Sequence, residues 1–184
     1  MKKKYVVAVT GASGIVYARR LLEILTPAAE VHIIISDVAE RIAQLEDVDL
    51  TGFDAVYAKN DDMFAALASG SFRYDGMVVI PCSMKTLAAI TAGVSDNLIT
   101  RAADVCLKEG RTCLLMPREM PLSRIHLRNM LAADEAGATV MVISPAFYTK
   151  PKTIDDLVDM VIARVLDHLG VEHDLSLRWG EDNA

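Results

Sequence analysis

Three short segments carry residue types suited to binding an anion and moving a proton. The first, Thr10-Gly11-Ala12-Ser13-Gly14, lies between a β-branched run and an amphipathic segment. Its glycines allow a tight turn, and the N-terminus of a following helix offers free N–H groups to an anion. The segment lacks the third glycine of the dinucleotide-binding fingerprint and the Gly-Lys-Ser/Thr of a P-loop. It favours a mononucleotide or similar anion site over an ordinary strand–helix turn, which has the same composition.

The second segment, residues 81–86, reads Pro-Cys-Ser-Met-Lys-Thr and also stands between a strand-like run and a helical one. The hydroxyls of Ser83 and Thr86, with the free N–H groups there, could hold a phosphate or the polar edge of a flavin. Ser83 would serve equally well as a plain helix N-cap. No histidine lies near Cys82 in the sequence, so we interpret this thiol as a small buried group and not as a nucleophile.

The third segment, residues 117–122, fixes Arg118 and Glu119 between two prolines. A surface ion pair contributes little to stability and needs no such rigidity. An arginine that binds a phosphate and a carboxyl that transfers a proton would need it. We therefore expect Arg118 and Glu119 to belong to a site.

Further cations lie on two predicted helices. Arg101 and Lys108 share one stripe of a helix over residues 97–109, and such a stripe is usually a solvated charged face. Arg164 flanks the apolar stripe of the last predicted helix, and Tyr148 precedes that helix. We expect these cations to form a local cationic pocket together with the arginine of the third segment.

A short-chain dehydrogenase is an alternative that one proline disfavours. The Thr-Gly-Ala-Ser-Gly string also opens many of those enzymes, and Tyr148 and Lys152 supply the spacing of their Tyr-x-x-x-Lys pair. That chemistry needs both side chains on one helix face, one turn apart. Pro151 stands between them and disfavours helical geometry.

A parallel sheet is needed to position these segments. Apolar, β-branched runs without clean alternation predict strands buried on both faces, at residues 5–10, 31–35, 77–80, 112–116 and 139–143. Helical periodicity predicts helices at residues 15–25, 39–45, 84–92, 97–109, 123–136 and 153–169. The alternation predicts one α/β domain, a flavodoxin-like or Rossmann-like doubly wound parallel sheet that binds ligands beyond the carboxyl ends of its strands. Residues 46–73 are expected to hold long loops.

The composition limits the function. The 184 residues carry 19 Lys+Arg against 25 Asp+Glu, and this net charge of −6 argues against a nucleic-acid surface. Three cysteines without a C-x-x-C pair argue against a disulfide framework or a thiolate zinc site and fit a reducing cytoplasm. We expect neither a signal peptide nor a membrane span, because the apolar runs are too short. The 52% apolar content is high for a free-standing domain and suggests subunits that share buried faces.

Taken together, the segments resemble the flavin prenyltransferases of the UbiX type over nearly the whole chain. The matching strings include residues 10–14, 81–86, 101–105, 117–122, 145–148 and 178–179. The resemblance implies a flavodoxin-like subunit in a homo-oligomer, typically a dodecamer, with active sites at subunit contacts. It also implies that a dimethylallyl group from dimethylallyl phosphate is joined to N5 and C6 of reduced FMN without a metal. The product, prenylated FMN, would serve UbiD-type decarboxylases.

The resemblance assigns roles residue by residue. FMN would be held by Gly11, Ala12, Ser13, Ser36, Ser83, Met84, Lys85, Thr86 and Arg101. The substrate phosphate would be held by Lys108, Arg118, Tyr148 and Arg164, with Ser69 in a loop near the substrate. Catalysis would use Glu119 as the proton donor to the phosphate, Ser13 and Glu46 for proton movement at the flavin, Lys108, and Trp179 stacked near the allylic group. Residues 1–170 would form the FMN-binding domain, and residues 171–184 a tail that contributes to the active site.

Two other functions remain as alternatives. Oxidative FMN-dependent cysteine decarboxylases carry a catalytic histidine after an early helix, and Ala-Asn where this chain has Met84-Lys85. The only early histidine here, His32, lies inside a predicted strand. A non-catalytic flavin carrier is the other alternative, and the fixed Arg118–Glu119 pair together with Trp179 argues against it.

Overall fold

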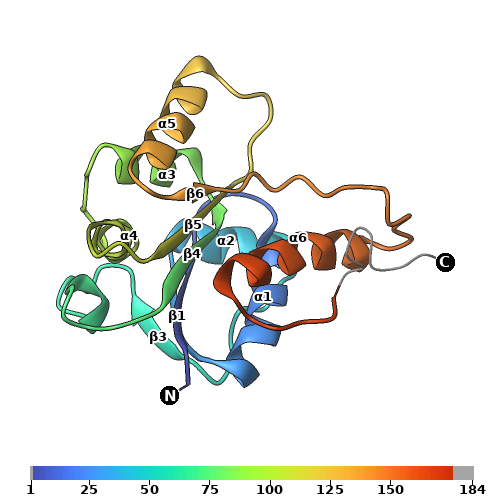
Figure 1. The fold of residues 1–184 in the computed structure, drawn as a ribbon, viewed down its shortest axis with the longest axis horizontal. Coiled ribbons are helices and arrows are strands. Elements are labelled where there is room, and N and C mark those ends of the chain that lie inside the picture. The colour runs from blue at the N-terminus through green and yellow to red at the C-terminus, as the bar shows by residue number, and fades with distance from the viewer. Residues whose placement is uncertain (1, 176–184) are drawn as a thin grey trace.

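The central strands are buried on both faces. In β1 (Lys4–Val9), Tyr5, Val7 and Val9 belong to one hydrophobic cluster, whereas Val6 and Ala8 belong to a second. Side chains alternate along a strand, so an unbroken apolar run requires cover on both sides. The computed structural model, which describes residues 2–175, confirms the doubly wound sheet between two layers of helices (Figure 1).

In the described part of the chain the strands form one parallel sheet in the order β3-β2-β1-β4-β5-β6. The other strands are β2 (Glu30–Ile35), β3 (Val56–Lys59), β4 (Gly76–Cys82), β5 (Thr112–Pro117) and β6 (Thr139–Val140). The order of the strands reverses between β1 and β4. This is the switch point at which open parallel sheets bind ligands, beyond the carboxyl ends of the strands.

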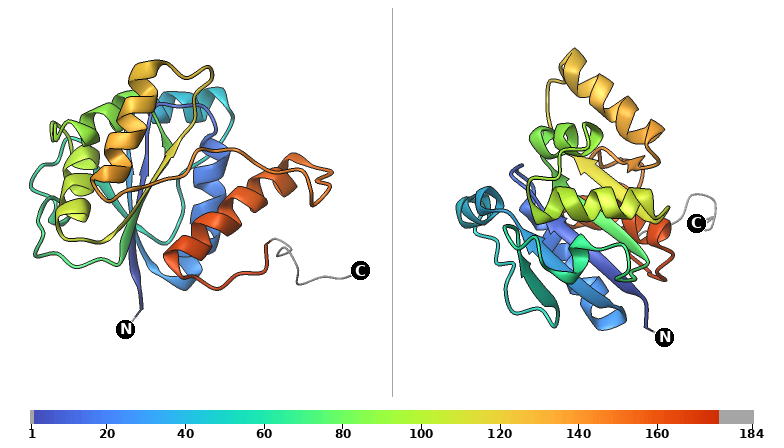
Figure 2. Two further views of the ribbon diagram at one scale, coloured as in Figure 1. Left: turned by 45° about the horizontal axis from the view of Figure 1, so that its top comes forward. Right: turned by 90° about the vertical axis from the view of Figure 1, so that its left-hand side faces the viewer.

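Each face of the sheet has its own set of helices (Figure 2). The first cluster takes residues from α1 (Ile15–Ala28), α2 (Asp37–Leu45) and α6 (Ile154–Leu169). The second takes residues from α3 (Met84–Thr91), α4 (Leu98–Lys108) and α5 (Arg124–Glu135). Polar side chains at the N-caps start most of these helices by accepting a backbone N–H from the first turn, namely Ser36, Ser83, Asn97, Ser123 and Thr153. No helix in residues 2–175 is both long and apolar enough to cross a bilayer.

The structure differs from the predicted elements at two places. Residues 46–73 hold the expected long loops, but they also contain β3 and a 3₁₀ turn (Ala66–Ala68), which were not predicted. β3 is an edge strand whose side chains are largely exposed, so it lacks the apolar run of a central strand. The last strand is only two residues long, although the backbone N–H groups of Met141 and Ile143 still donate to β5 carbonyls at 2.8 and 3.1 Å.

Residues 141–153, called the arm below, connect β6 to α6 and extend away from the sheet (Figure 1). Phe147 on the arm is 69% exposed, and Ile154, the first residue of α6 after the arm, is 73% exposed. Met120 and Ile125, before and in α5, are also exposed. Large apolar side chains gathered on a surface are typical of a subunit interface.

Candidate functional site

Thr10 joins the loops that follow β1 and β4. Its buried hydroxyl donates to the carbonyl of Pro81 at 2.8 Å and accepts from the backbone N–H of Ser83 at 2.7 Å. Ser83 Oγ in turn donates to the Thr86 hydroxyl and accepts from the Thr86 N–H. Two of the segments singled out by their sequence therefore form one hydrogen-bonded unit at the switch point.

Thr10→Val is expected to lower the free energy of unfolding by about 1–3 kcal/mol, because it leaves the part-buried N–H of Ser83 without its partner and removes one of the two hydrogen bonds to the Pro81 carbonyl. Thr26→Val is the matched control, since the Thr26 hydroxyl only adds a bond to the Leu22 carbonyl within α1. Thermal unfolding of both variants measures the difference, at about 2–4 °C per kcal/mol for a chain of this size. Equal melting temperatures for the two variants would show that Thr10 does not fix the loops.

Two glycines allow the first loop to lie close to its neighbours. A Cβ on Gly11 would lie 2.6 Å from Cγ1 of Val38, so the first turn of α2 packs directly on the loop. Gly14 caps α1 with φ 101°, a conformation that favours glycine. α1, α2 and α3 each begin directly after β1, β2 and β4, so their N-termini lie at the same edge. Helix N-termini carry partial positive charge, and the N-termini of α2 and α3 beside the first loop fit the phosphate of FMN.

Glu46 lies against the first loop. Its carboxylate accepts from the backbone N–H groups of Gly14 at 2.9 Å and Ile15 at 2.8 Å, so it satisfies free donors at the start of α1. The chain reaches this position because Glu46 is the C-cap of α2, which lies beside the loop. The structure thus places Glu46 next to Ser13, the other residue predicted to assist proton movement.

The Arg118–Glu119 pair comes to the same edge from β5. Arg118 Nε donates to the carbonyl of Ser13 at 3.1 Å, which fixes the guanidinium over the first loop. Glu119 is exposed, and its Oε1 accepts from the N–H of Met120 at 2.9 Å. We use the name carboxyl-edge group for the predicted residues that the structure brings together here, Gly11, Ala12, Ser13, Ser36, Glu46, Ser83, Met84, Lys85, Thr86, Arg118 and Glu119.

A hollow of about 590 Å³ adjoins this edge, next to Ser36. It lies beyond β2 and β3 and is lined by Ile35, Asp37, Tyr57 and Asn60 among others. Asp37 follows a predicted strand, whereas Tyr57 and Asn60 were not singled out because β3 was not predicted.

A second group of predicted residues lies elsewhere in the same chain. Arg101 Nε donates to the carbonyl of Ala68 at 3.0 Å, next to Ser69, and so joins α4 to that loop. Lys108 pairs with Glu109 directly over Gly70, where a Cβ would lie 2.8 Å from Lys108 Nζ. The name α4 group is used below for Ser69, Arg101 and Lys108.

The α4 group extends to the opposite end of the sheet from Arg118. Lys108 comes just before β5 and Arg118 just after it, and a strand of six residues is about 20 Å long. The expected cationic pocket therefore does not form within one chain.

Tyr148 and Arg164, called the C-terminal pair below, make up a third group of predicted residues. Tyr148 lies on the arm and is 55% exposed, and Arg164 is exposed in the second half of α6. The carbonyl of Leu169, at the end of that helix, accepts from the hydroxyl of Tyr5 at the start of β1. Ser13 follows the other end of β1, so Arg164 is also separated from the carboxyl-edge group. Trp179 lies outside the described residues.

Cys82 has the properties of a structural residue. It is fully buried, and burial raises the pKa of its thiol to about 12, so the thiol stays protonated at neutral pH. We expect the native protein at pH 8 to leave Cys82 unmodified by iodoacetamide, whereas the unfolded chain is alkylated there. Peptide mass spectrometry distinguishes the two, and rapid alkylation of the native thiol would contradict the structural role.

Two of the alternative interpretations lose their structural basis. Lys150 has φ 54° and α6 begins only at Ile154, so Tyr148 and Lys152 do not share a helix face as a dehydrogenase pair would. His32 lies within β2, is 7% exposed, and has its Nε2 3.1 Å from Glu30 Oε1. It does not lie at the carboxyl edge, where a catalytic histidine of a decarboxylase would be needed.

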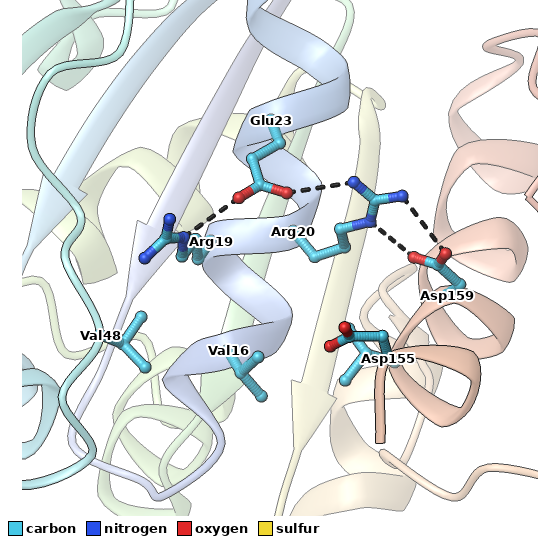
Figure 3. A pocket seen from close by; sticks show the side chains of 8 residues that line it. Val16, Arg19, Arg20, Glu23, Val48, Asp155 and Asp159 are labelled. Atoms are coloured by element: carbon cyan, nitrogen blue, oxygen red, sulfur yellow. Dashed lines mark hydrogen bonds and ion pairs between the residues drawn. The ribbon is translucent and has the colours of Figure 1, made fainter. Parts of the chain in front are cut away.

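A separate pocket of about 530 Å³ lies between α1 and α6 (Figure 3). Arg20 crosses it to Asp159, with Nε 2.6 Å and Nη2 3.2 Å from the two carboxylate oxygens, and also pairs with Glu23. These ion pairs raise the pKa of Arg20 above its ordinary value, with the hydrogen bond to Asp159 as the largest cause. The pocket contains none of the predicted site residues, and its charges join two helices.

Comparisons with known proteins identify the family. The Flavoprotein family model matches residues 1–166. The chain is 51% identical to the flavin prenyltransferase UbiX of Methanocaldococcus jannaschii over 181 residues, which are 96% of this chain and 98% of that protein.

Two solved structures are similar over nearly their full length. AnUbiX in complex with FMN and dimethylallyl pyrophosphate superposes with a TM-score of 0.94 at 43% identity and full coverage of both chains. A dodecameric FMN-dependent UbiX-like decarboxylase from Escherichia coli O157:H7 superposes with a TM-score of 0.91 at 48% identity, covering 96% of this chain and 98% of that one. The protein described here belongs to the Flavoprotein family and, within it, to the flavin prenyltransferases of the UbiX type.

Proposed function

We propose that the protein joins the dimethylallyl group of dimethylallyl phosphate to N5 and C6 of reduced FMN. The observation that carries the proposal is the carboxyl-edge group, in which Arg118 and Glu119 lie over a loop beside three helix N-termini. A similar chain, AnUbiX, has been crystallised with FMN and dimethylallyl pyrophosphate. The arrangement supplies a cation that can bind the phosphate and a carboxyl group that can donate a proton. A reaction that releases phosphate without a metal requires both.

The roles of the side chains follow from their positions. Bound reduced FMN supplies the nucleophilic nitrogen and carbon, and the loop after β1 with the N-termini of α2 and α3 holds its phosphate. Arg118 binds the substrate phosphate together with Lys108, Tyr148 and Arg164. As the allylic C–O bond breaks, Glu119 gives a proton to the departing phosphate oxygen. Ser13 and Glu46 move protons at the flavin, and Trp179 stacks near the allylic group, where an aromatic face stabilises positive charge.

The active site is built from several copies of the chain. The carboxyl-edge group, the α4 group and the C-terminal pair of Tyr148 and Arg164 lie at separate places on one subunit, so they meet only when subunits assemble. The exposed apolar residues around α5 and the arm support this assembly. We propose a homo-oligomer, a dodecamer like its relative from Escherichia coli. Residues 171–184 would complete a site of the same or a neighbouring copy.

The product and the compartment complete the proposal. Prenylated FMN would pass to a UbiD-type decarboxylase, and the protein would act in the cytoplasm. The three cysteines are all free and buried, which suits a reducing compartment.

Anaerobic incubation with reduced FMN and dimethylallyl phosphate tests the activity directly. Mass spectrometry of the released flavin is expected to show one added C5 unit. Unmodified FMN retained by the protein would instead indicate a flavin carrier. Oxidative decarboxylation of a cysteine-terminated peptide under the same conditions would indicate a cysteine decarboxylase.

A further inference from the structure

Arg164 is held by a carboxylate on its own helix. Arg164 and Asp167 are three residues apart in α6 and so lie on one face, and Arg164 Nη1 lies 2.6 Å from Asp167 Oδ2. Within residues 2–175 the guanidinium makes no other hydrogen bond, so its remaining N–H groups are available to a ligand. The Asp167 side chain is only 20% exposed, in contrast to 62% for Arg164.

The chain beyond α6 folds back to hold this carboxylate. Gly170 ends the helix in the left-handed conformation, and the N–H of Val171 donates to the carbonyl of Leu166 at 3.0 Å. This turn returns His173 to the last turn of α6, where its side chain is 3% exposed. The backbone N–H of Leu175 donates to His173 Nδ1 at 3.4 Å. With Nδ1 as the acceptor, Nε2 is the nitrogen that donates, and it lies 3.1 Å from Asp167 Oδ1.

We propose that Asp167 and His173 are positioning residues, which hold Arg164 in the orientation that binds the phosphate of dimethylallyl phosphate. The inference rests on the proposed function, in which Arg164 is one of the phosphate ligands. A buried histidine donates to one oxygen of the carboxylate, and the other oxygen holds one edge of the guanidinium. The exposed edge is left for an anion.

Stability alone does not account for this arrangement. An arginine–carboxylate pair near a helix surface contributes little to the stability of the fold. Fixing a long side chain before the ligand arrives has a different benefit, because the ordering cost is then no longer subtracted from the binding free energy. His173 holds Asp167 and Asp167 holds Arg164, so the exposed Arg164 side chain is ordered before the ligand binds.

The test measures binding without turnover. Dimethylallyl phosphate is titrated calorimetrically into the assembled protein loaded with oxidised FMN, which does not accept the prenyl group. Asp167→Asn and His173→Leu are expected to weaken binding about three- to tenfold. His173→Gln, which retains an N–H donor near the Nε2 position, is expected to bind as the wild type does. With reduced FMN the same two weakening variants should raise KM for dimethylallyl phosphate and leave kcat nearly unchanged.

Asp159→Asn is the matched control. It removes an ion pair from the same helix, but its partner is Arg20 on α1 and not Arg164 (Figure 3). Size-exclusion chromatography and FMN affinity confirm that each variant assembles. Wild-type affinity in Asp167→Asn and His173→Leu, with binding lost in Arg164→Ala, overturns the positioning role and leaves the proposed function standing. Tight binding by a wild-type protein that forms no prenylated flavin overturns the proposed function but not the positioning role.

Discussion

Glu119→Gln is expected to retain FMN and to lower kcat by about 100-fold or more, the usual contribution of a general acid. Proline on each side fixes the segment, and the Met120 N–H already engages one carboxylate oxygen, so the side chain is directed before substrate binds. Glutamine preserves the shape and that hydrogen bond but has no proton to give. Affinity for the substrate phosphate should change little, because the cations that bind it remain.

Single-turnover formation of prenylated FMN is the appropriate measurement, since it separates the chemical step from product release. Glu135→Gln, an exposed carboxylate at the end of α5, is the control for loss of one negative charge. Turnover by Glu119→Gln equal to that of the control would remove the proton-transfer role. Loss of FMN from Glu119→Gln would show that the carboxylate belongs to the flavin-binding surface.

Two inactive variants are expected to restore activity when they share one oligomer. Lys108→Ala damages the α4 group and Glu119→Gln damages the carboxyl-edge group, and β5, a strand about 20 Å long, separates these two residues in one chain. If each active site takes its lysine and its glutamate from different copies, a randomly mixed oligomer has both residues intact at about a quarter of its sites. Co-expression with two purification tags isolates the mixed oligomers, and prenylation is measured against each variant alone.

The matched control combines two variants of one group. Arg101 and Lys108 both lie on α4, so they come from the same copy at every site, and Arg101→Ala mixed with Lys108→Ala should leave every site damaged. Equal recovery in both mixtures would contradict a site divided between the α4 group and the carboxyl-edge group. No recovery in the first mixture would place Lys108 and Glu119 in the same copy.

The sheet could be predicted because its central strands are buried on both faces. Tyr5 to Val9 alternate between two hydrophobic clusters, and no polar residue interrupts such a run. The loops that bind ligands follow from the sheet, because parallel strands place their carboxyl ends at one edge. β3 escaped prediction for the opposite reason, since three of its four residues are exposed at the edge of the sheet.

Only some of the candidate site residues could be placed in space from the sequence. Residues directly after a strand, such as Ser13, Ser83 and Arg118, could be located by topology alone. Side chains on helices, such as Lys108 and Arg164, could be recognised by type but not placed, because the sequence does not state which copy of the chain they face. His173 was missed entirely, since its role depends on the turn at Gly170 that returns it to α6.

If the arm completes a neighbour's site, as proposed, activity is expected to depend on protein concentration. The arm carries Tyr148, whose side chain is 55% exposed, and in the proposed assembly this side chain would serve a neighbouring copy. In the proposed assembly each subunit would supply part of one site and receive the rest of its own site from neighbours, so the assembly is the unit that would turn over substrate. By mass action, dilution below the dissociation constant of the assembly lowers the specific activity of every chain. An added ligand that binds across subunits, as FMN and the allylic phosphate would, then shifts this equilibrium toward the assembled and active form.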